Sequence, residues 1–340
     1  MKFVNIFFLL LLLSTFQPVS YAEIELNSEK KANNSFIVAE LKDAPDAVQI
    51  DNNLLKESAL PWWGWALLLF IVCFLLGIIA VLGGVGGGVL FVPIVGSFFP
   101  FHMDFVRATG LLLALSGALS STPSLLRSGM INLRLGMPLA LVASISSILG
   151  AYVGLMLPVN IVQIALGLTI LCIVVVMFTS KKSEFPDVEK SDLIAEAFQM
   201  NGIYYDQSIG REIQWKVHRT PLGLVLFFLI GILAGMFGLG AGWANVPVLN
   251  QVMGAPLKVS VSSSAFILSV ADTTAAWVYI NKGAMVPMIV TPSLIGIMLG
   301  AKIGVRLLKK TKPEHIKKVV ILILIIASLR SLLKGFKIWN

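Results

Sequence analysis

Long apolar stretches separated by short polar ones run from residue 62 to the end of the chain. Most are long enough to cross a membrane as a helix, which takes about 20 residues. The pattern predicts an all-α polytopic membrane protein with about eight full transmembrane helices and two glycine-broken or re-entrant segments. The predicted spans are 62–82, 104–125, 135–157 and 159–179, then 221–238, 258–280, 285–307 and 317–335.

The two interrupted segments, 84–100 and 239–254, are apolar, rich in glycine and contain a proline. Gly77 to Pro93 reads GIIAVLGGVGGGVLFVP, and Gly231 to Pro247 reads GILAGMFGLGAGWANVP. These stretches align without a gap at an offset of 154 residues (231 − 77), with eight of seventeen positions identical. Two broken helices at matching places in the two halves of a membrane protein point to a substrate site.

The repeat continues beyond these segments. Gly129 matches Gly283 at the offset of 154 residues, and Leu149-Gly150-Ala151 matches Leu299-Gly300-Ala301 at 150. We therefore expect two pseudo-symmetric repeats that arose by duplication. If the interrupted segments cross the membrane, the repeats are inverted, and most Lys and Arg residues of the loops lie on the cytoplasmic side, as such residues usually do. The residues that favour this crossing arrangement are Arg127, Arg134, Lys181, Lys182, Arg306, Lys309, Lys310 and Lys312, whereas Lys282 falls on the other side.

The polar stretches set the domain boundaries. Residues 1–22 resemble a signal peptide or an uncleaved anchor, and 23–60 form a polar periplasmic or extracellular leader. Repeat 1 covers 61–180, a cytoplasmic inter-repeat loop covers 181–220, and repeat 2 covers 221–340. Within the loop, residues 192–200 suggest a short amphipathic helix and 202–219 a small β-hairpin turning at Ser208 to Gly210. We expect a multi-pass protein of the bacterial inner (plasma) membrane.

Composition narrows the function. The chain is 57% hydrophobic and 13% charged, so its net charge of +8 marks helix ends and loops rather than a nucleic-acid partner. Two cysteines inside apolar spans and three scattered histidines offer no metal site. The sequence lacks HExxH, GxSxG and Walker motifs, so we predict neither an enzyme nor a cofactor. The expected partners are the lipid bilayer and a small anion, and association into a homo-oligomer is left open.

The interrupted segments supply the candidate substrate-binding residues. Glycines let a helix start be approached closely, and the free N–H groups there attract anions. Tight helix packing is the alternative reason for glycines in membrane helices. Small polar residues that follow at equivalent positions add hydroxyl groups. The candidates are Gly84, Gly86, Gly87, Gly88, Thr109, Gly238, Gly240, Gly242, Asn245, Ser262, Ser263 and Ser264.

Asp272 is the candidate for proton coupling. It lies well inside an apolar span, where burying a carboxyl group is costly. The equivalent position in repeat 1 is Ala118. A structural role is the alternative, through an ion pair with Lys302 or hydrogen bonds to the neighbouring Thr273 and Thr274. Arg107 stands near the start of its span, where it would draw anions by electrostatics.

The repeated GxGGG…VP element, the Ala108-Thr109-Gly110 and Ser262-Ser263-Ser264 patches, and the Leu-Gly-Ala close of each half resemble the sulfite exporter TauE/SafE family. The resemblance covers residues 62–335. It implies a secondary transporter of small anions such as sulfite or organosulfonates that works by alternating access. In the second copy Ala241 replaces a glycine of the motif, and Trp243 and Asn245 follow.

Two other functions remain as alternatives. A cation or metal permease needs several ligands within the spans, and Asp272 alone would be too few. A non-transporting membrane anchor or assembly protein would use the leader and residues 181–220 as docking surfaces.

Overall fold

The computed structural model describes residues 62–83, 86–99, 101–179, 184, 186, 188–206, 210–308 and 313–336. The predicted signal peptide and leader lie outside these residues. The fold below is that of the unit Ala66–Asn340, and its first helix begins four residues earlier.

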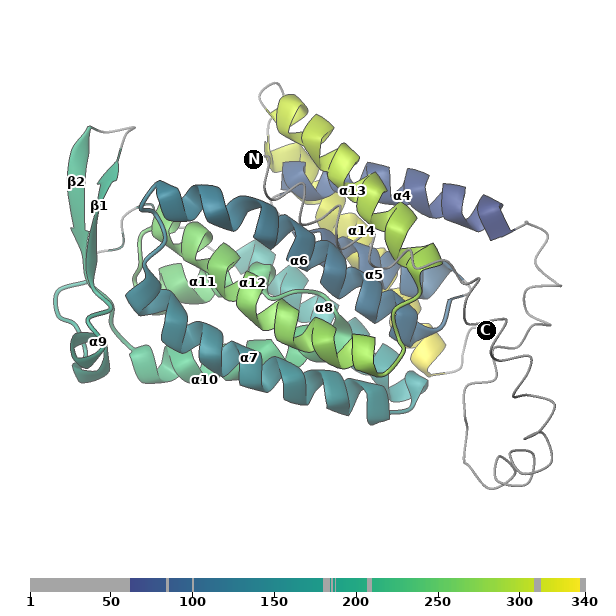
Figure 1. Cartoon of the computed structure of the whole chain (residues 1–340), viewed down its shortest axis with the longest axis horizontal. Coiled ribbons are helices and arrows are strands. Elements are labelled where there is room, and N and C mark those ends of the chain that lie inside the picture. Colours follow the sequence, from purple (N-terminus) through teal and green to yellow (C-terminus); the bar gives the residue numbers. More distant parts are fainter. Residues whose placement is uncertain are drawn as a thin grey trace, which may run out of the picture. The chain divides into compact units, whose positions relative to one another are not determined.

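Two runs of helices form this unit, one before and one after the inter-repeat loop in the sequence (Figure 1). The first run contains α4 (Trp62–Gly83), α5 (Gly87–Phe98), α6 (Met103–Arg127), α7 (Leu133–Met156) and α8 (Val159–Thr179). The second contains α10 (Thr220–Phe237), α11 (Gly242–Pro247), the π-helix η1 (Val248–Val252), α12 (Leu257–Asn281), α13 (Pro287–Leu308) and α14 (Pro313–Gly335).

Seven helices within the described residues are long and apolar enough to cross a membrane: α4, α6, α7, α8, α10, α12 and α13. The eighth predicted span, 317–335, falls in α14. In contrast, α5 has 12 residues. At a rise of about 1.5 Å per residue it reaches about 18 Å, against a hydrocarbon core of about 30 Å. The predicted interrupted segments are therefore half-length helices.

In helix α7 the side that faces outward and the side that packs against other helices carry different side chains. Its outward side chains are large and apolar, with Leu141 and Ile145 each more than 60% exposed. Beyond Leu139 its inward side chains are small, and Ala143, Ser147 and Gly150 are buried against α10 and α12. Small residues let membrane helices approach closely, whereas large apolar ones suit lipid tails.

The inter-repeat loop is folded as the sequence predicts. Its helix α9 (Leu193–Ala197) precedes the strands β1 (Gly202–Asp206) and β2 (Arg211–Trp215), which pair antiparallel. Gly210 has a φ of +70°, a conformation that suits glycine in a tight turn. We call the end of the unit that carries these strands the hairpin end.

Hydrogen bonds bring helix starts from both runs to the hairpin end. The backbone N–H of Asn132, just before α7, donates to Ser263 Oγ of α12 over 3.4 Å. The backbone N–H of His218, just before α10, donates to the carbonyl of Met253 over 3.1 Å. The chain after η1 has thus returned to the end from which α10 began. The second interrupted segment therefore runs back along α10 instead of remaining where α10 ends.

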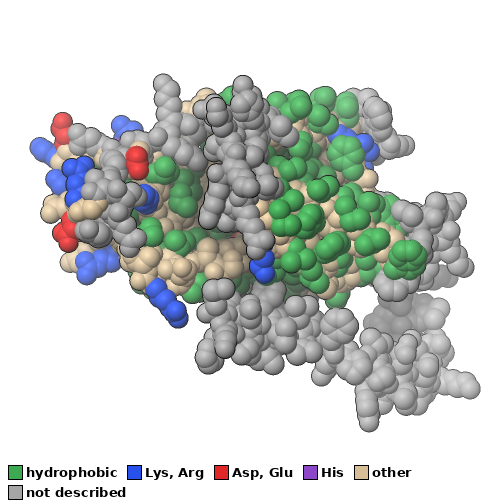
Figure 2. Space-filling view, turned by 90° about the horizontal axis from the view of Figure 1, so that it is seen from above, with side chains coloured by type: hydrophobic (Ala, Val, Ile, Leu, Met, Phe, Trp, Pro, Cys, Tyr) green, Lys and Arg blue, Asp and Glu red, His purple; other side chains and the backbone are tan. Residues whose placement is uncertain are grey.

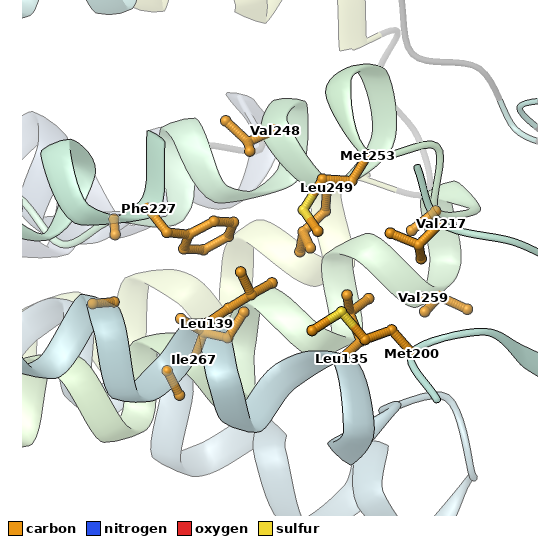
Figure 3. Close-up of a cluster of buried hydrophobic side chains, with 14 of the residues drawn as sticks. Leu135, Leu139, Met200, Val217, Phe227, Val248, Leu249, Met253, Val259 and Ile267 are labelled. Atoms are coloured by element: carbon orange, nitrogen blue, oxygen red, sulfur yellow. The ribbon is translucent and has the colours of Figure 1, made fainter. Parts of the chain in front are cut away.

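A buried apolar cluster joins the first run of helices to the second at this end (Figure 3). Leu135 and Leu139 of α7 meet Phe227 of α10 and Leu249 of η1. Met200 of the inter-repeat loop belongs to the same cluster. The loop is consequently part of the packed structure and does more than connect the two runs.

Charged and hydrophobic side chains occupy different parts of the surface (Figure 2). Lys, Arg, Asp and Glu side chains gather at the left of this view, toward the hairpin end, while hydrophobic side chains cover much of the rest. This distribution suits helices embedded in lipid with a polar hairpin end in water.

Candidate substrate site at the helix breaks

Both predicted helix breaks are present. In the first, α4 ends at Gly83, and α5 begins after Gly86, which is extended at φ −61° and ψ 148°. Gly84 lies outside the described residues. In the second, α10 ends at Phe237, and both Gly238 and Gly240 have positive φ values of 66° and 70°. Any residue with a Cβ would be strained there, so the glycines are what allow the helix to stop.

The two breaks meet between α6 and α12. A Cβ added to Gly88 of α5 would stand 2.7 Å from the carbonyl oxygen of Gly110 and 2.8 Å from that of Leu239. On the other side, a Cβ at Gly240 would come within 3.4 Å of Asp272 Oδ2. Backbone from the first break, the second break and α6 therefore touches directly. Tight packing, the alternative explanation for these glycines, is realised at Gly88.

The half-length helices leave the breaks toward opposite ends. Helix α6 runs from Met103 to Arg127, which adjoins the turn at the hairpin end. Because α5 leads into the start of α6, it points away from the hairpin end, whereas α11 and η1 lead back to it. Figure 1 shows α11 near the hairpin and α5 toward the opposite end.

The predicted glycines differ in the space around them. Gly86 is exposed and has no neighbour within 4 Å of an added Cβ. Gly87 faces the side chain of Ile297 in α13, and Gly242 faces Cδ1 of Leu268 at 3.2 Å. Gly86 is therefore the candidate that leaves its backbone open.

Asp272 and Asn245 are fully buried polar residues without partners. Neither Asp272 carboxyl oxygen, and neither polar atom of the Asn245 side chain, has a hydrogen bond within the described structure. The structural alternatives for Asp272 are not formed. Thr273 donates to its own helix at Ser269 O, 2.6 Å away, and Lys302 is exposed. Unpaired polar groups are costly in a membrane interior and mark functional positions.

The hydroxyl residues serve different neighbours. Thr109 Oγ1 donates to Phe105 O within its own helix at 2.7 Å. Ser263 Oγ accepts the Asn132 N–H and so faces the turn at the hairpin end. Ser262 and Ser264 are buried in the same turn of α12. Of these candidates, Asp272 lies beside the second break, next to Gly240. Ser263 instead faces the turn at the hairpin end.

Arg107 is buried rather than open to an approaching anion. Its guanidinium pairs with Asp104 one turn earlier, and its Nη1 donates to Gly154 O at 2.9 Å and to Met236 O at 3.0 Å. Tyr279 of α12 donates to Gly235 O at 2.8 Å. Two donors thus hold carbonyl groups in the last turn of α10, immediately before the second break. The positive charge also suits the carboxyl end of a helix.

The sequence marks Arg107 by its position inside a span, because ionisable residues at such positions are rarely incidental. Tyr279 carries no such signal, since tyrosines are common in membrane helices. The described residues contain no group of three His, Cys, Asp or Glu side chains that could hold a metal ion.

Membrane-length helices around two half-length helices define a polytopic membrane protein. The family model described as sulfite exporter TauE/SafE matches residues 69–331, and the chain belongs to this family. The chain is 24% identical over 277 residues to the Bacillus subtilis protein named "Probable membrane transporter protein YunE", covering 78% of this chain and 98% of that one. It is also 24% identical over 266 residues to "Probable membrane transporter protein ORF9" of Sinorhizobium sp., covering 78% and 91%. No solved structure matches the chain significantly.

Proposed function

We propose that this membrane transporter is a secondary transporter of a small anion, such as sulfite or an organosulfonate, in the bacterial inner membrane. The family's description supports the substrate class. The observation that carries the proposal is that two buried residues, Asp272 and Asn245, have no hydrogen-bond partner near the point where the two broken helices meet. Discontinuous helices at the junction of two repeats are where secondary transporters bind their substrates.

The proposal includes an inverted relation between the halves, which equivalent contacts support. A Cβ at Gly77 of α4 would meet the carbonyl of Ile297 in α13 at 2.5 Å. A Cβ at Gly231 of α10 would meet the carbonyl of Ala143 in α7 at 2.7 Å. Both glycines and both carbonyls are 154 residues apart (231 − 77 and 297 − 143). In each case a helix of one half packs against the other half, as alternating access by rocking of two repeats requires.

The hairpin end is proposed to face the cytoplasm. Arg127 and Arg134 flank the turn between α6 and α7 there, and short cytoplasmic loops carry an excess of such residues. Residues 23–60 would then lie on the periplasmic side.

Asp272 is proposed to couple transport to protons. As a neutral acid it donates a hydrogen bond to a bound anion, and as a carboxylate it repels one. Loading of the proton and loading of the anion therefore favour each other, which is a reciprocal coupling. Asn245 supplies an amide donor that remains neutral throughout the cycle, and the exposed backbone at Gly86 is proposed to add an N–H donor.

Flux measurements in proteoliposomes test this proposal. Sulfite, thiosulfate, organosulfonates and small carboxylates would be supplied with and without a pH gradient. We expect flux of at least one of these anions, accelerated by the gradient. Asp272→Asn keeps the shape of the side chain but removes the titratable group, so the response to the gradient should disappear. Asn245→Ala should slow flux at least about tenfold, the cost of one or two hydrogen bonds to a charged group.

Thr273→Ala is the matched control, because Thr273 adjoins Asp272 but is exposed and bonds within its own helix. It should retain both the flux and its response to the gradient. Absence of flux for every anion in well-folded protein would overturn the transporter proposal and favour a membrane anchor. Flux that responds equally to the gradient in Asp272→Asn would remove only the coupling role.

A further inference from the structure

A second polar site lies at the hairpin end, apart from the helix breaks. A cavity of about 390 Å³ opens between the α6–α7 turn and the hairpin. Its lining comes from the first run of helices, the inter-repeat loop and the second run, to which Val259 of α12 belongs. Cavities of a few hundred Å³ accommodate small organic molecules.

Trp215 gives this cavity an unused hydrogen-bond donor. The residue is only 7% exposed, and its indole Nε1–H has no partner within the described structure. A Cβ added to Gly202, which also lines the cavity, would stand 3.2 Å from Cε2 of Trp215, the ring atom bonded to Nε1. The same Cβ would stand 2.8 Å from Nδ2 of Asn132. Glycine at this position thus leaves two donor-bearing side chains side by side.

Charge at the cavity favours an anion. Arg134 lines it from the first turn of α7, is exposed, and forms no ion pair with any described residue. None of the described lining residues is acidic. The start of α7, a helix of 24 residues, adds the partial positive charge of its free N–H groups. The buried indole donor is an observation independent of that helix start.

The rest of the lining is mainly apolar and includes Ile131, Leu133, Ile203 and Val259. We propose that this cavity binds an organic anion, with its carboxylate, sulfonate or phosphate group held by Arg134 and Trp215 Nε1–H. Its apolar body packs against the aliphatic lining. The cavity would be a regulatory site, because a ligand there touches both helix runs and the loop that joins them.

The site is tested by calorimetric titration of the full-length protein in lipid nanodiscs, with benzoate and benzenesulfonate as probes and benzamide as the neutral analogue. We expect both anions to bind and benzamide to bind at least about tenfold more weakly, the worth of one charge-assisted hydrogen bond. Arg134→Gln should weaken anion binding about tenfold, and Trp215→Phe, which keeps the ring and removes the N–H, about threefold to tenfold.

Two variants are matched controls. Arg127→Gln changes an exposed arginine that flanks the same turn outside the cavity, and Trp277→Phe changes an exposed tryptophan of α12. Both should bind the probes as the wild type does. Equal affinity for benzamide, or undiminished binding in Arg134→Gln and Trp215→Phe, would overturn the proposal. Binding that is lost in Asn245→Ala but kept in Arg134→Gln would place the anion at the helix breaks, and this too would overturn it.

Discussion

The two interrupted segments occupy equivalent places in the sequence but differ in chemistry. The first buries Phe91 where the second buries Asn245, 154 residues later. The flanking helices differ as well, since α6 has Ala118 where α12 has Asp272. The second segment and its neighbour thus carry the unpartnered polar groups, while the first contributes apolar packing.

The buried arginine, in contrast, belongs to the first half and has no charged counterpart in the second. Arg107 belongs to α6 of the first half, and its counterpart in α12 is Val261, which is exposed. The guanidinium nevertheless bonds to the end of α10 in the second half. The first half, which lacks counterparts of Asp272 and Asn245, therefore helps Tyr279 to hold the second break in place.

Replacing this cation should have the largest effect on stability. Arg107→Met removes the guanidinium beside Asp104, frees the carbonyl of Gly154 and leaves the carbonyl of Met236 with only the longer hydrogen bond from Tyr279. Asp104 is partly exposed, so most of the loss comes from the two buried hydrogen bonds of the charged group, worth about 1.5–3 kcal/mol each. This loss should appear as a large fall in the thermal unfolding midpoint. Arg127→Met, an exposed change at the other end of α6, is the control. Equal midpoints for the two variants would show that the first half does not support the second break.

A methyl group at the junction of the two breaks should have an intermediate effect. In Gly88→Ala the new Cβ meets two backbone carbonyls that cannot swing aside, and overpacking of this kind costs about 1–3 kcal/mol. Gly86→Ala, two residues earlier, adds the same methyl group to open space. The unfolding midpoint should fall only for Gly88→Ala. If both variants melt alike, the breaks do not pack as closely as described.

The smallest effect is expected at Tyr279. Tyr279→Phe removes only the hydroxyl that donates to Gly235 O and Met236 O, for a loss of about 1 kcal/mol. Arg107 still holds Met236 in this variant, so α10 should remain in place. In Tyr279→Phe combined with Arg107→Met, the loss should exceed the sum of the single losses because both donors serve one helix end. Strict additivity would argue against a shared role.

Much of this fold could be predicted from residue types alone. The span predicted at 104–125 is α6, Met103–Arg127, because membrane helices are set by the length of an apolar run. The helix breaks were predictable because glycine has few other uses at matching places in two apolar runs. The turns at Gly129 and Gly283 agree as well, with φ of 69° and 68°.

The site was less predictable, because its chemistry depends on which groups lack partners. Sequence identifies Asp272 as an acid inside a span, but not whether Lys302 or Thr273 satisfies it. It likewise places Arg107 near a helix start without revealing the two carbonyls that occupy it. The Arg107 outcome depends on contacts with residues 47 and 129 positions away, and the Asp272 outcome on contacts that are not made. Local sequence patterns contain neither kind of information.

The Asp192 side chain has a consequence for how the chain could be divided. Its carboxylate accepts hydrogen bonds from Ala195 N of α9 and from both the backbone N–H and the hydroxyl of Thr220, the first residue of α10. The inter-repeat loop is thus anchored to the half that follows it. Two polypeptides separated directly after Thr179 would leave this anchor intact and should associate when produced together. A cut between Asp192 and Thr220 would separate a helix from the residue that caps it.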